Sequence, residues 1–356
     1  MESTNYFYEY SKYESIVLFE NNKIDEKCDL SIVVPTYKRI DLLRETILSI
    51  IKQKSPKHLK YEVIIVSNDI DFRVTDLKLD YGKLHLAIYA NKNNIGMCGN
   101  MNKCASLAKG KYIAYLQDDD LLLDDYLCTI EQLIDNGIMS DVSCLIPNRY
   151  FYLDENDKVS IFGTKTKRKE KAKHYINKIL RLGCKEYMLQ QVLPEDCYRL
   201  FYNCFTGGPT CGILFDKKKL LKSEGFNPDY PYSFDYVFFL KYSASNKVVL
   251  YNKYLAIYRM TESASNKPQV QYDFFRSEIF LINTMKNSRW NCLNNDILIK
   301  FAYDTKSKEA QNLIQKDYKI KSCSHLTYWC FRIYRYVKLM RSGLYRKDII
   351  NNLPIN

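Results

Sequence analysis

Short apolar runs alternate with stretches of helical spacing along the first third of the chain. The apolar runs lie at 30–34, 63–66, 84–89 and 112–116, and each has the length of a buried β-strand. Between the first two runs, apolar residues recur at helical spacing from Asp41 to Ile51. Strands that alternate with helices are typical of βαβ units. The pattern therefore predicts an α/β fold with a mainly parallel, doubly wound sheet.

Towards both ends of the chain the pattern changes. The first 28 residues are polar and tyrosine-rich with no clear period, so we expect an N-terminal extension at 1–28. The α/β pattern continues less regularly to about residue 268, and a helical pattern follows to the end. We therefore expect a main domain at 29–268 and a helical C-terminal region at 269–356.

Composition narrows the class of protein. Of the 356 residues, 46% are hydrophobic and 26% charged, which is enough apolar material for a sizeable core. No run of about 18 apolar residues occurs, and the first residues lack signal-peptide features, so neither a spanning helix nor a secretory leader is predicted. The 12 cysteines include no C-x-x-C pair, which favours reduced thiols in a cytoplasmic protein over a zinc ribbon or redox site.

The net charge of +12 predicts an anionic partner. Nucleic acid, an anionic membrane surface and phosphorylated small molecules all fit this charge. A basic run at 165–173 contributes to it, and its simplest interpretation is a solvated loop or helix face.

Polar segments directly follow three of the predicted strands. They are Pro35-Thr36-Tyr37-Lys38-Arg39, Ser67-Asn68-Asp69 and Asp118-Asp119-Asp120. In open α/β sheets, ligands bind in the crevice at the carboxyl ends of the strands. Two familiar nucleotide sites are excluded, because the first turn lacks the glycines of G-x-G-x-x-G and no Walker-type P-loop occurs.

The three successive carboxylates repel one another unless a cation or hydrogen-bond donors screen them. A strand would place Asp118 and Asp120 on the same side. This arrangement favours Mg²⁺ or Mn²⁺, which prefer oxygen ligands and keep positions for phosphate. The alternative is that some of these aspartates cap the next helix, a role that Asp124 and Asp125 fit better.

The stretch from Leu30 to about Leu127 resembles the nucleotide-sugar-binding half of a GT-A fold glycosyltransferase of family 2. The matching pieces, in order, are the opening strand with Pro35-Thr36-Tyr37-Lys38-Arg39, the second strand ending at Asp69, the segment Asn94-Ile95-Gly96, and a D-x-D element at Asp118-Asp119-Asp120. The resemblance divides the main domain into a nucleotide-sugar-binding half at 29–127 and an acceptor-binding half at 128–268.

The resemblance also implies roles for single residues. Asp120 and Asp118 would ligate a divalent cation that bridges the donor's diphosphate, with Asp119 as an alternative ligand. The nucleotide itself would be bound by Pro35, Thr36, Tyr37, Arg39, Asp69, Asn94, Gly96, Asp118, Asp119 and Arg259.

Inverting sugar transfer also needs a base for the acceptor hydroxyl. Asp235 resembles the base of the family's E-D segment, although Phe234 stands where the family has glutamate. The alternatives for the base are Asp229 and the pair at 195–196, and Asp235 could instead interact with a helix dipole.

Two further segments resemble parts of the acceptor half. Residues 207–215 resemble the acceptor-side strand, where small residues leave room for sugar, although an ordinary glycine turn fits equally well. Residues 258–265 resemble the segment that closes over the diphosphate. In this segment Thr261 replaces the usual histidine, and Arg259 would neutralise phosphate charge.

The C-terminal segment 326–341 has apolar residues on one helical face and basic residues on the other. This pattern is typical of a helix in a membrane interface, and packing on the main domain is the alternative.

Taken together, the sequence predicts a metal-dependent inverting glycosyltransferase in surface polysaccharide or glycoconjugate synthesis. Its donor would be a nucleotide sugar, first of all a UDP-sugar, and its acceptor a glycan or lipid diphosphate. We expect it in the cytoplasm or peripherally on the inner face of the cell membrane, with no nucleic-acid partner. The alternatives are a nucleotidyltransferase and a non-catalytic glycan- or nucleic-acid-binding module. The first needs a glycine-rich first turn, and the second leaves the three aspartates unexplained.

Overall fold

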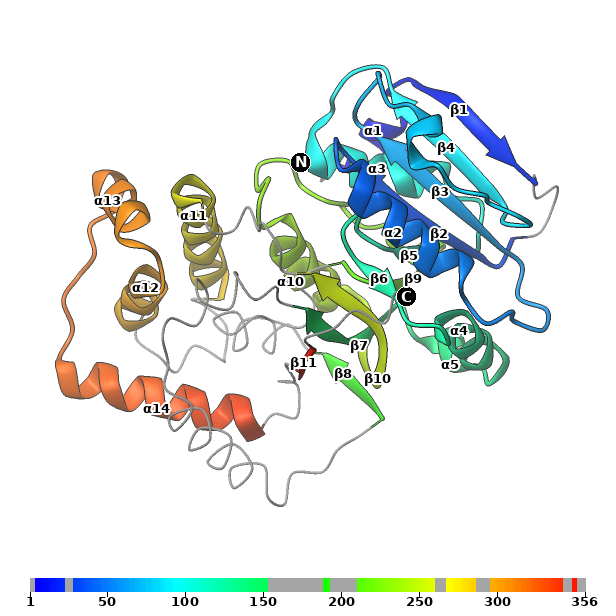
Figure 1. The fold of residues 1–356 in the computed structure, drawn as a ribbon. Helices are drawn as coiled ribbons and strands as arrows, with labels where there is room; N and C mark the ends of the chain where they lie inside the picture. The colour runs from blue at the N-terminus through cyan, green and yellow to red at the C-terminus, as the bar shows by residue number, and fades with distance from the viewer. Residues whose placement is uncertain are drawn as a thin grey trace.

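The computed structural model describes residues 4–22, 28–152, 188–192, 210–259, 267–285, 295–341 and 348–350. The predicted basic run at 165–173, the pair at 195–196, residues 207–209 and Thr261 lie outside these ranges. The described strands form one mixed sheet with helices on both faces, next to a group of C-terminal helices (Figure 1).

The centre of the sheet consists of four parallel strands. They are β4 (Leu86–Asn91), β3 (Tyr61–Ser67), β2 (Leu30–Thr36) and β5 (Tyr112–Tyr115), in that spatial order. Every residue of β2 is buried, which explains why its sequence is almost continuously apolar. The predicted α/β class, with its parallel doubly wound sheet, is confirmed.

The second half of the chain extends the same sheet. Strand β9 (Ile213–Asp216) runs antiparallel to both β5 and β7 (Cys144–Tyr152), and β10 (Val248–Arg259) runs parallel to β7. Two short strands, β6 (Leu121–Leu122) and β8 (Leu189–Val192), pair with β10. A third, β11 (Asp348–Ile350), pairs with β7. The sheet therefore contains antiparallel pairs beside its parallel centre.

The N-terminal residues also join this sheet. Helix α1 (Tyr6–Ser11) packs on α3 (Gly96–Leu107), and β1 (Ser15–Asn21) pairs antiparallel with β4 at the edge. The segment that we expected to be an extension at 1–28 thus supplies an edge strand. Only one side of this strand is paired, and none of its residues is fully buried, as is usual for a strand at the edge of a sheet.

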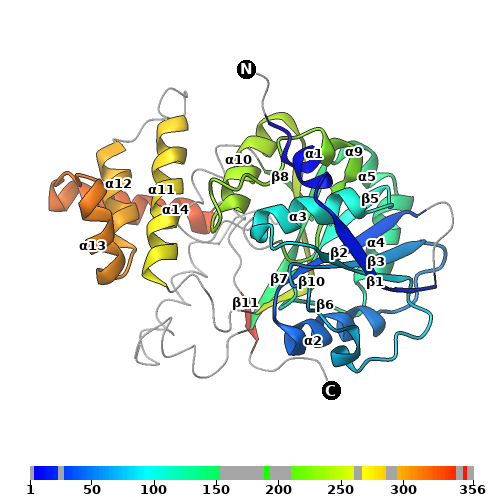
Figure 2. The same cartoon turned by 90° about the horizontal axis from the view of Figure 1, so that it is seen from above.

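Helices cover both faces of the sheet (Figure 2), and a layer of buried apolar side chains lies on each face. Helices α2 (Ile40–Ile51) and α4 (Tyr126–Asp135) pack on one face, and α3 and α10 (Phe234–Ser245) pack on the other. The remaining short helices are η1 (Val74–Leu77), α5 (Ile138–Asp141) and α9 (Lys217–Leu221).

The predicted helical C-terminal region is confirmed. It comprises α11 (Pro268–Met285), α12 (Asn295–Asp304), α13 (Lys308–Asp317) and α14 (His325–Arg341). Phe275, Ala302 and Ile314 form a small core between the first three of these helices. Over the part of the chain that the structure describes, no helix has the length and apolarity needed to span a membrane.

Candidate active site

Asp118, Asp119 and Asp120 form a turn between β5 and β6, which we call the 118–120 turn. Thr46 of α2 fixes this turn, because its Oγ1 lies 3.0 Å from the carbonyl oxygen of Asp118 and 2.8 Å from that of Asp120. The expectation that strand geometry places both carboxylates on one side is wrong, since β5 ends at Tyr115. The two carboxylates instead have separate sets of partners.

Asp118 belongs to the first turn of the sheet. Its Oδ2 accepts a hydrogen bond from the Thr36 hydroxyl at 2.8 Å and a longer one from the Tyr37 N–H at 3.4 Å. The Arg39 guanidinium lies 3.5 Å from Asp118 Oδ1 and 2.7 Å from Asp119 Oδ2. Burial raises the pKa of Asp118 to about 6, and the neighbouring Asp119 charge adds to this effect. Both oxygens of Asp118 are thus engaged by donors, which makes it a poorer metal ligand than predicted.

Asp120 has a different environment. Its side chain is fully buried, and its Oδ1 accepts a hydrogen bond from the Arg259 N–H at 3.1 Å. Its Oδ2 is buried without a hydrogen-bond partner. Burial raises the pKa of Asp120 well above its usual range, and Asp119 contributes in the same direction. A buried carboxylate oxygen that lacks a donor fits the oxygen-ligand chemistry of a divalent cation.

The structure supplies only part of a complete metal site. Across the described ranges, no group of three or more His, Cys, Asp or Glu side chains has the placement of a metal site. Any cation bound through Asp120 would therefore need other oxygen ligands, such as water or the donor's phosphates.

The place of Arg259 differs from the prediction that it neutralises phosphate charge. Its guanidinium is buried and points to α2, where it pairs with the Glu45 carboxylate and donates to the carbonyl oxygen of Leu42 at 3.2 Å. Its Nε donates to the carbonyl oxygen of Asp119. Arg259 therefore holds the 118–120 turn against α2, and this buried placement does not support a direct phosphate contact.

Asp235 lies in the first turn of α10 and is partly buried. Burial raises its pKa to about 6, while its own N–H, that of Tyr236 and the Arg149 charge act in the opposite direction. Arg149 of β7 is buried, and this burial lowers the pKa of its guanidinium, while the nearby Cys211 and Asp120 act in the opposite direction. Sequence reasoning missed Arg149, because a lone arginine within a strand carries no signal.

The phenol of Tyr258 in β10 lies close enough to the 118–120 turn and to Asp235 for the charges of both to act on its pKa. Burial raises the pKa of its phenol, and the charges of Asp120, Asp119 and Asp235 raise it further. The 118–120 turn and Asp235 therefore share one electrostatic neighbourhood, although they are more than 100 residues apart in the chain. Asp229, the alternative base, is exposed. Its charge adds to the effect of burial in raising the pKa values of Tyr6 and Tyr230.

Asp69, Asn94 and Gly96 lie at the ends of β3 and β4. Asp69 Oδ1 accepts a hydrogen bond from the Asp71 N–H at 3.2 Å, and Asn94 Oδ1 accepts one from the Gly96 N–H at 2.9 Å. Gly96 has φ of 73° at the start of α3, a conformation that favours glycine. Its carbonyl oxygen accepts a hydrogen bond from the Asn68 amide at 2.9 Å.

A buried asparagine network behind these turns was not predicted. Asn91 donates to Asn68 at 2.8 Å and to Asn100 at 3.0 Å, and Asn100 donates to the Val66 carbonyl oxygen at 2.8 Å. The three amides connect the end of β3 to the start of α3. Asn68 and Asn91 lie at strand ends, where asparagine is common in turns, and Asn100 lies within α3, so no local pattern predicts that the three side chains meet.

The small residues Cys211 and Gly212, which precede β9, lie next to the 118–120 turn and the end of β5. Cys211 is fully buried, and the nearby Asp120 charge adds to the effect of burial in raising its thiol pKa. Gly212 has φ of 70°, and a Cβ there would lie 3.3 Å from side-chain atoms of Leu122, Tyr126 and Ala256. Close packing therefore requires this glycine, whatever its relation to an acceptor.

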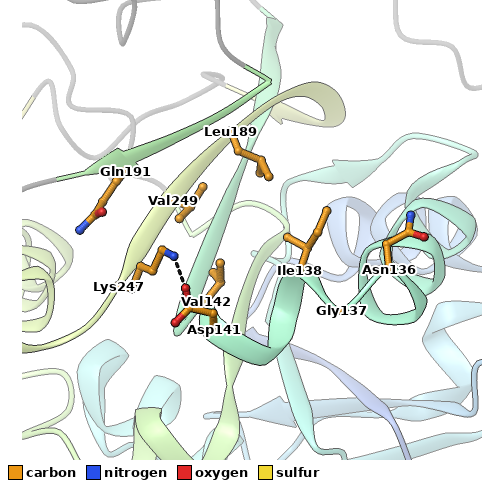
Figure 3. Close-up of a pocket in the computed structure, with 9 residues that line it drawn as sticks. All are labelled: Asn136, Gly137, Ile138, Asp141, Val142, Leu189, Gln191, Lys247 and Val249. Atoms are coloured by element: carbon orange, nitrogen blue, oxygen red, sulfur yellow. Dashed lines mark hydrogen bonds and ion pairs between the residues drawn. The ribbon is translucent and has the colours of Figure 1, made fainter.

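A hollow of about 510 Å³ lies elsewhere on the molecule (Figure 3). It is lined by Ile138, Val142, Leu189, Val249 and five further residues, which include the ion pair of Asp141 with Lys247. These residues lie near the amino ends of β7 and β10, whereas the 118–120 turn contacts the carboxyl end of β10. The hollow thus contains none of the predicted site residues.

The model of glycosyl transferase family 2 matches residues 31–192. An uncharacterized glycosyltransferase from Haemophilus influenzae is 27% identical over 270 residues, which cover 68% of this chain and 71% of that protein. In several other curated glycosyltransferases the match is shorter, and the chain spans only 15–38% of their length.

Two solved structures share the fold. S. aureus TarS 1–349 in complex with UDP-GlcNAc has a TM-score of 0.51 at 16% identity, covering 89% of this chain and 82% of that one. The mannosyltransferase PcManGT from Pyrobaculum calidifontis, in complex with GDP-Man and Mn²⁺, has a TM-score of 0.50 at 14% identity, covering 94% and 91%. Residues 31–192 are thus similar to glycosyl transferase family 2, and with the sheet described above these likenesses show that the chain has the GT-A fold.

Proposed function

We propose that the chain is a metal-dependent inverting glycosyltransferase that uses a nucleotide-diphosphate sugar. The observation that carries the proposal is the division of the 118–120 turn between two sets of partners. Asp118 is bound to the first turn of the sheet, and Asp120 is buried with a free oxygen in the neighbourhood of Asp235. One turn thus connects the expected nucleotide side with the expected base.

The first turn would bind the nucleotide. Tyr37 is 45% exposed, and Lys38 Nζ lies over its ring at 5.2 Å from the centroid. A base could stack on the ring face opposite Lys38. Arg39 is partly exposed while paired with Asp118 and Asp119, so its remaining donors could meet phosphate oxygens. Asp69 stands at the end of the next strand, within the same edge of the sheet. TarS was solved with UDP-GlcNAc and PcManGT with GDP-Man, so we propose a nucleotide sugar and test UDP-sugars first.

Asp120 would be the principal protein ligand of a divalent cation, ahead of Asp118 and Asp119. Its Oδ2 is buried without a hydrogen-bond partner, whereas Asp118 and Asp119 are both paired with Arg39. When bound, Mn²⁺ or Mg²⁺ would offset the charge that develops on the leaving diphosphate. The occurrence of Mn²⁺ in the PcManGT complex supports this choice of ion.

Asp235 would act as the base. Its carboxylate accepts the proton of the acceptor hydroxyl as that oxygen forms a bond to the anomeric carbon. The bond from that carbon to the diphosphate oxygen breaks, and its electron pair leaves with the nucleoside diphosphate. A pKa of about 6 suits this task, because the group is ionised near neutral pH and still basic enough to take a proton.

The acceptor would be a glycan or a lipid diphosphate in surface polysaccharide or glycoconjugate synthesis. The excess of positive charge favours an anionic acceptor or surface, and the acidic 118–120 turn disfavours nucleic acid. A lipid-linked acceptor would require the enzyme to work at a membrane surface, on the cytoplasmic side.

A screen of nucleotide sugars with Mn²⁺ tests the proposal directly. We expect one donor to give transfer or slow hydrolysis that chelation of the metal abolishes, with release of a nucleoside diphosphate. Release of pyrophosphate would identify a nucleotidyltransferase instead. NMR of the product should show the opposite anomeric configuration to the donor, and retained configuration would refute the inverting mechanism.

The Asp235→Asn variant serves as the control for this screen. It should bind UDP as the wild type does and release no sugar, because the amide cannot accept the proton. If neither protein binds any nucleoside diphosphate with Mn²⁺, the chain is a binding module of another kind.

A further inference from the structure

Helix α14 exposes a row of large apolar side chains. Leu326 is 71% exposed, Trp329 is 62% exposed and Ile333 is 43% exposed. Their spacing of three and four residues places them on one face of the helix. Such a contiguous row is uncommon on a soluble surface and marks an interaction site.

The opposite side of α14 packs on α12, which determines the direction in which the apolar row faces. Phe331 is buried, and its ring meets that of Phe301 in α12 edge-on at 5.7 Å between centroids. The Tyr328 hydroxyl donates to Asp304 of α12 at 2.7 Å. The exposed row therefore faces away from α12, and helix α14 itself lies on the side of the molecule remote from the edge strand β1 (Figure 1).

The sequence around the row is strongly basic. Residues 318–347 contain no Asp or Glu and eight Lys or Arg residues, at 319, 321, 332, 335, 338, 341, 346 and 347. Lys319, Lys321 and Arg332 are among the exposed ones. An apolar face with flanking cations fits the boundary between acyl chains and anionic head groups.

We propose that α14 docks on an anionic phospholipid surface, with Leu326, Trp329 and Ile333 inserted into the interface. A second copy of the chain is a less suitable occupant, because a two-fold interface would place the same cations opposite each other. The inference rests on the proposed function and deepens it, since docking would bring the transferase to a lipid-linked acceptor.

Co-sedimentation with vesicles tests the docking. The full chain should bind phosphatidylcholine vesicles that contain phosphatidylglycerol, and binding should weaken in high salt and on phosphatidylcholine alone. The double variant Leu326→Ser, Trp329→Ser should lower the partition coefficient at least about tenfold, because two large side chains lose their burial in lipid. The matched control is Tyr8→Ser, Val17→Ser, which removes side chains that are 64% and 56% exposed near the edge strand.

The outcomes separate this proposal from the proposed function. UDP binding with Mn²⁺ and donor hydrolysis should be equal in the wild type, the α14 variant and the control. Absence of vesicle binding, or an equal loss in the control, would overturn the docking while leaving the transferase intact. A wild-type dimer that the α14 variant converts to monomer, without vesicle binding, would overturn it in favour of a second copy.

Discussion

Replacing Asp120 with Asn should make the metal-free protein more stable and remove its response to metal and nucleotide. The carboxylate is fully buried, and one of its oxygens has no donor. Asparagine keeps the acceptor for the Arg259 N–H and removes the charge. The same substitution removes the oxygen that we assign to the cation, so stability and function should change in opposite directions.

The magnitude follows from the burial of an ionisable group. Asparagine leaves its amide N–H groups without an acceptor where Oδ2 stood, so the gain comes from removing the ionisable carboxyl. Desolvation of an unpaired buried group costs about 1–3 kcal/mol and more for a charged one, so the metal-free variant should gain roughly 1–3 kcal/mol. The wild type should instead gain about 2.7 kcal/mol when ligand is present at a hundred times its dissociation constant. Since burial raises the folded-state pKa of Asp120, its ionisation destabilises the fold as pH rises. The advantage of the variant should therefore shrink in acid, below the ordinary pKa of an aspartate.

Urea denaturation of both proteins, with and without Mn²⁺ and UDP, measures these terms. The matched control is Asp124→Asn, four residues along the chain and exposed, which should change neither stability nor response. A metal-free Asp120→Asn protein that is less stable than the wild type, or that keeps the full stabilisation by Mn²⁺ and UDP, would refute the reasoning.

Three further predictions concern the surroundings of this turn. The acid limb of the kcat/KM profile should lie near pH 6, because protonated Asp235 cannot take the acceptor's proton, and a flat profile through that pH would contradict its role. Arg259→Lys should weaken UDP binding with Mn²⁺ at least about tenfold, because lysine cannot reproduce the guanidinium's several donors, whereas the exposed Arg276→Lys should bind UDP unchanged. Asn91→Ala should lower the free energy of unfolding by about 1–3 kcal/mol in urea, since it removes the Asn91 donor from the Asn100 oxygen and leaves the Asn68 oxygen with only the long bond from the Ile95 N–H. An unchanged midpoint would exclude the network as a stabilising element.

The central strands could be predicted because a strand buried on both faces has a short, nearly continuous apolar segment of its own. A parallel strand covered on both faces is nearly all apolar, and β2, β3 and β5 satisfy this condition. Strand β1 was not predicted, although Ile16-Val17-Leu18-Phe19 is a β-type run. An edge strand has one neighbour, so its pairing with β4 depends on a partner about 70 residues away.

The candidate site shows a sharper limit. Residue types and their order placed the aspartates at the strand end, but the side to which each points depends on where β5 stops. Alternation along a strand applies only while the strand continues. Beyond Tyr115 the backbone turns, and Asp118 and Asp120 find partners in β2 and β10.

Arg259 shows why a residue's type and position do not determine its role. An arginine at the end of a strand beside a phosphate-binding site predicts a phosphate contact, and nothing local in the sequence contradicts that. Its partner Glu45 lies 214 residues earlier in the chain, and the Asp119 carbonyl oxygen lies 140 residues earlier. With its donors directed to these groups, the guanidinium fixes the backbone that carries Asp120. If a diphosphate binds as we propose, Arg259 would act on it only indirectly, by fixing the turn that carries the proposed metal ligand Asp120.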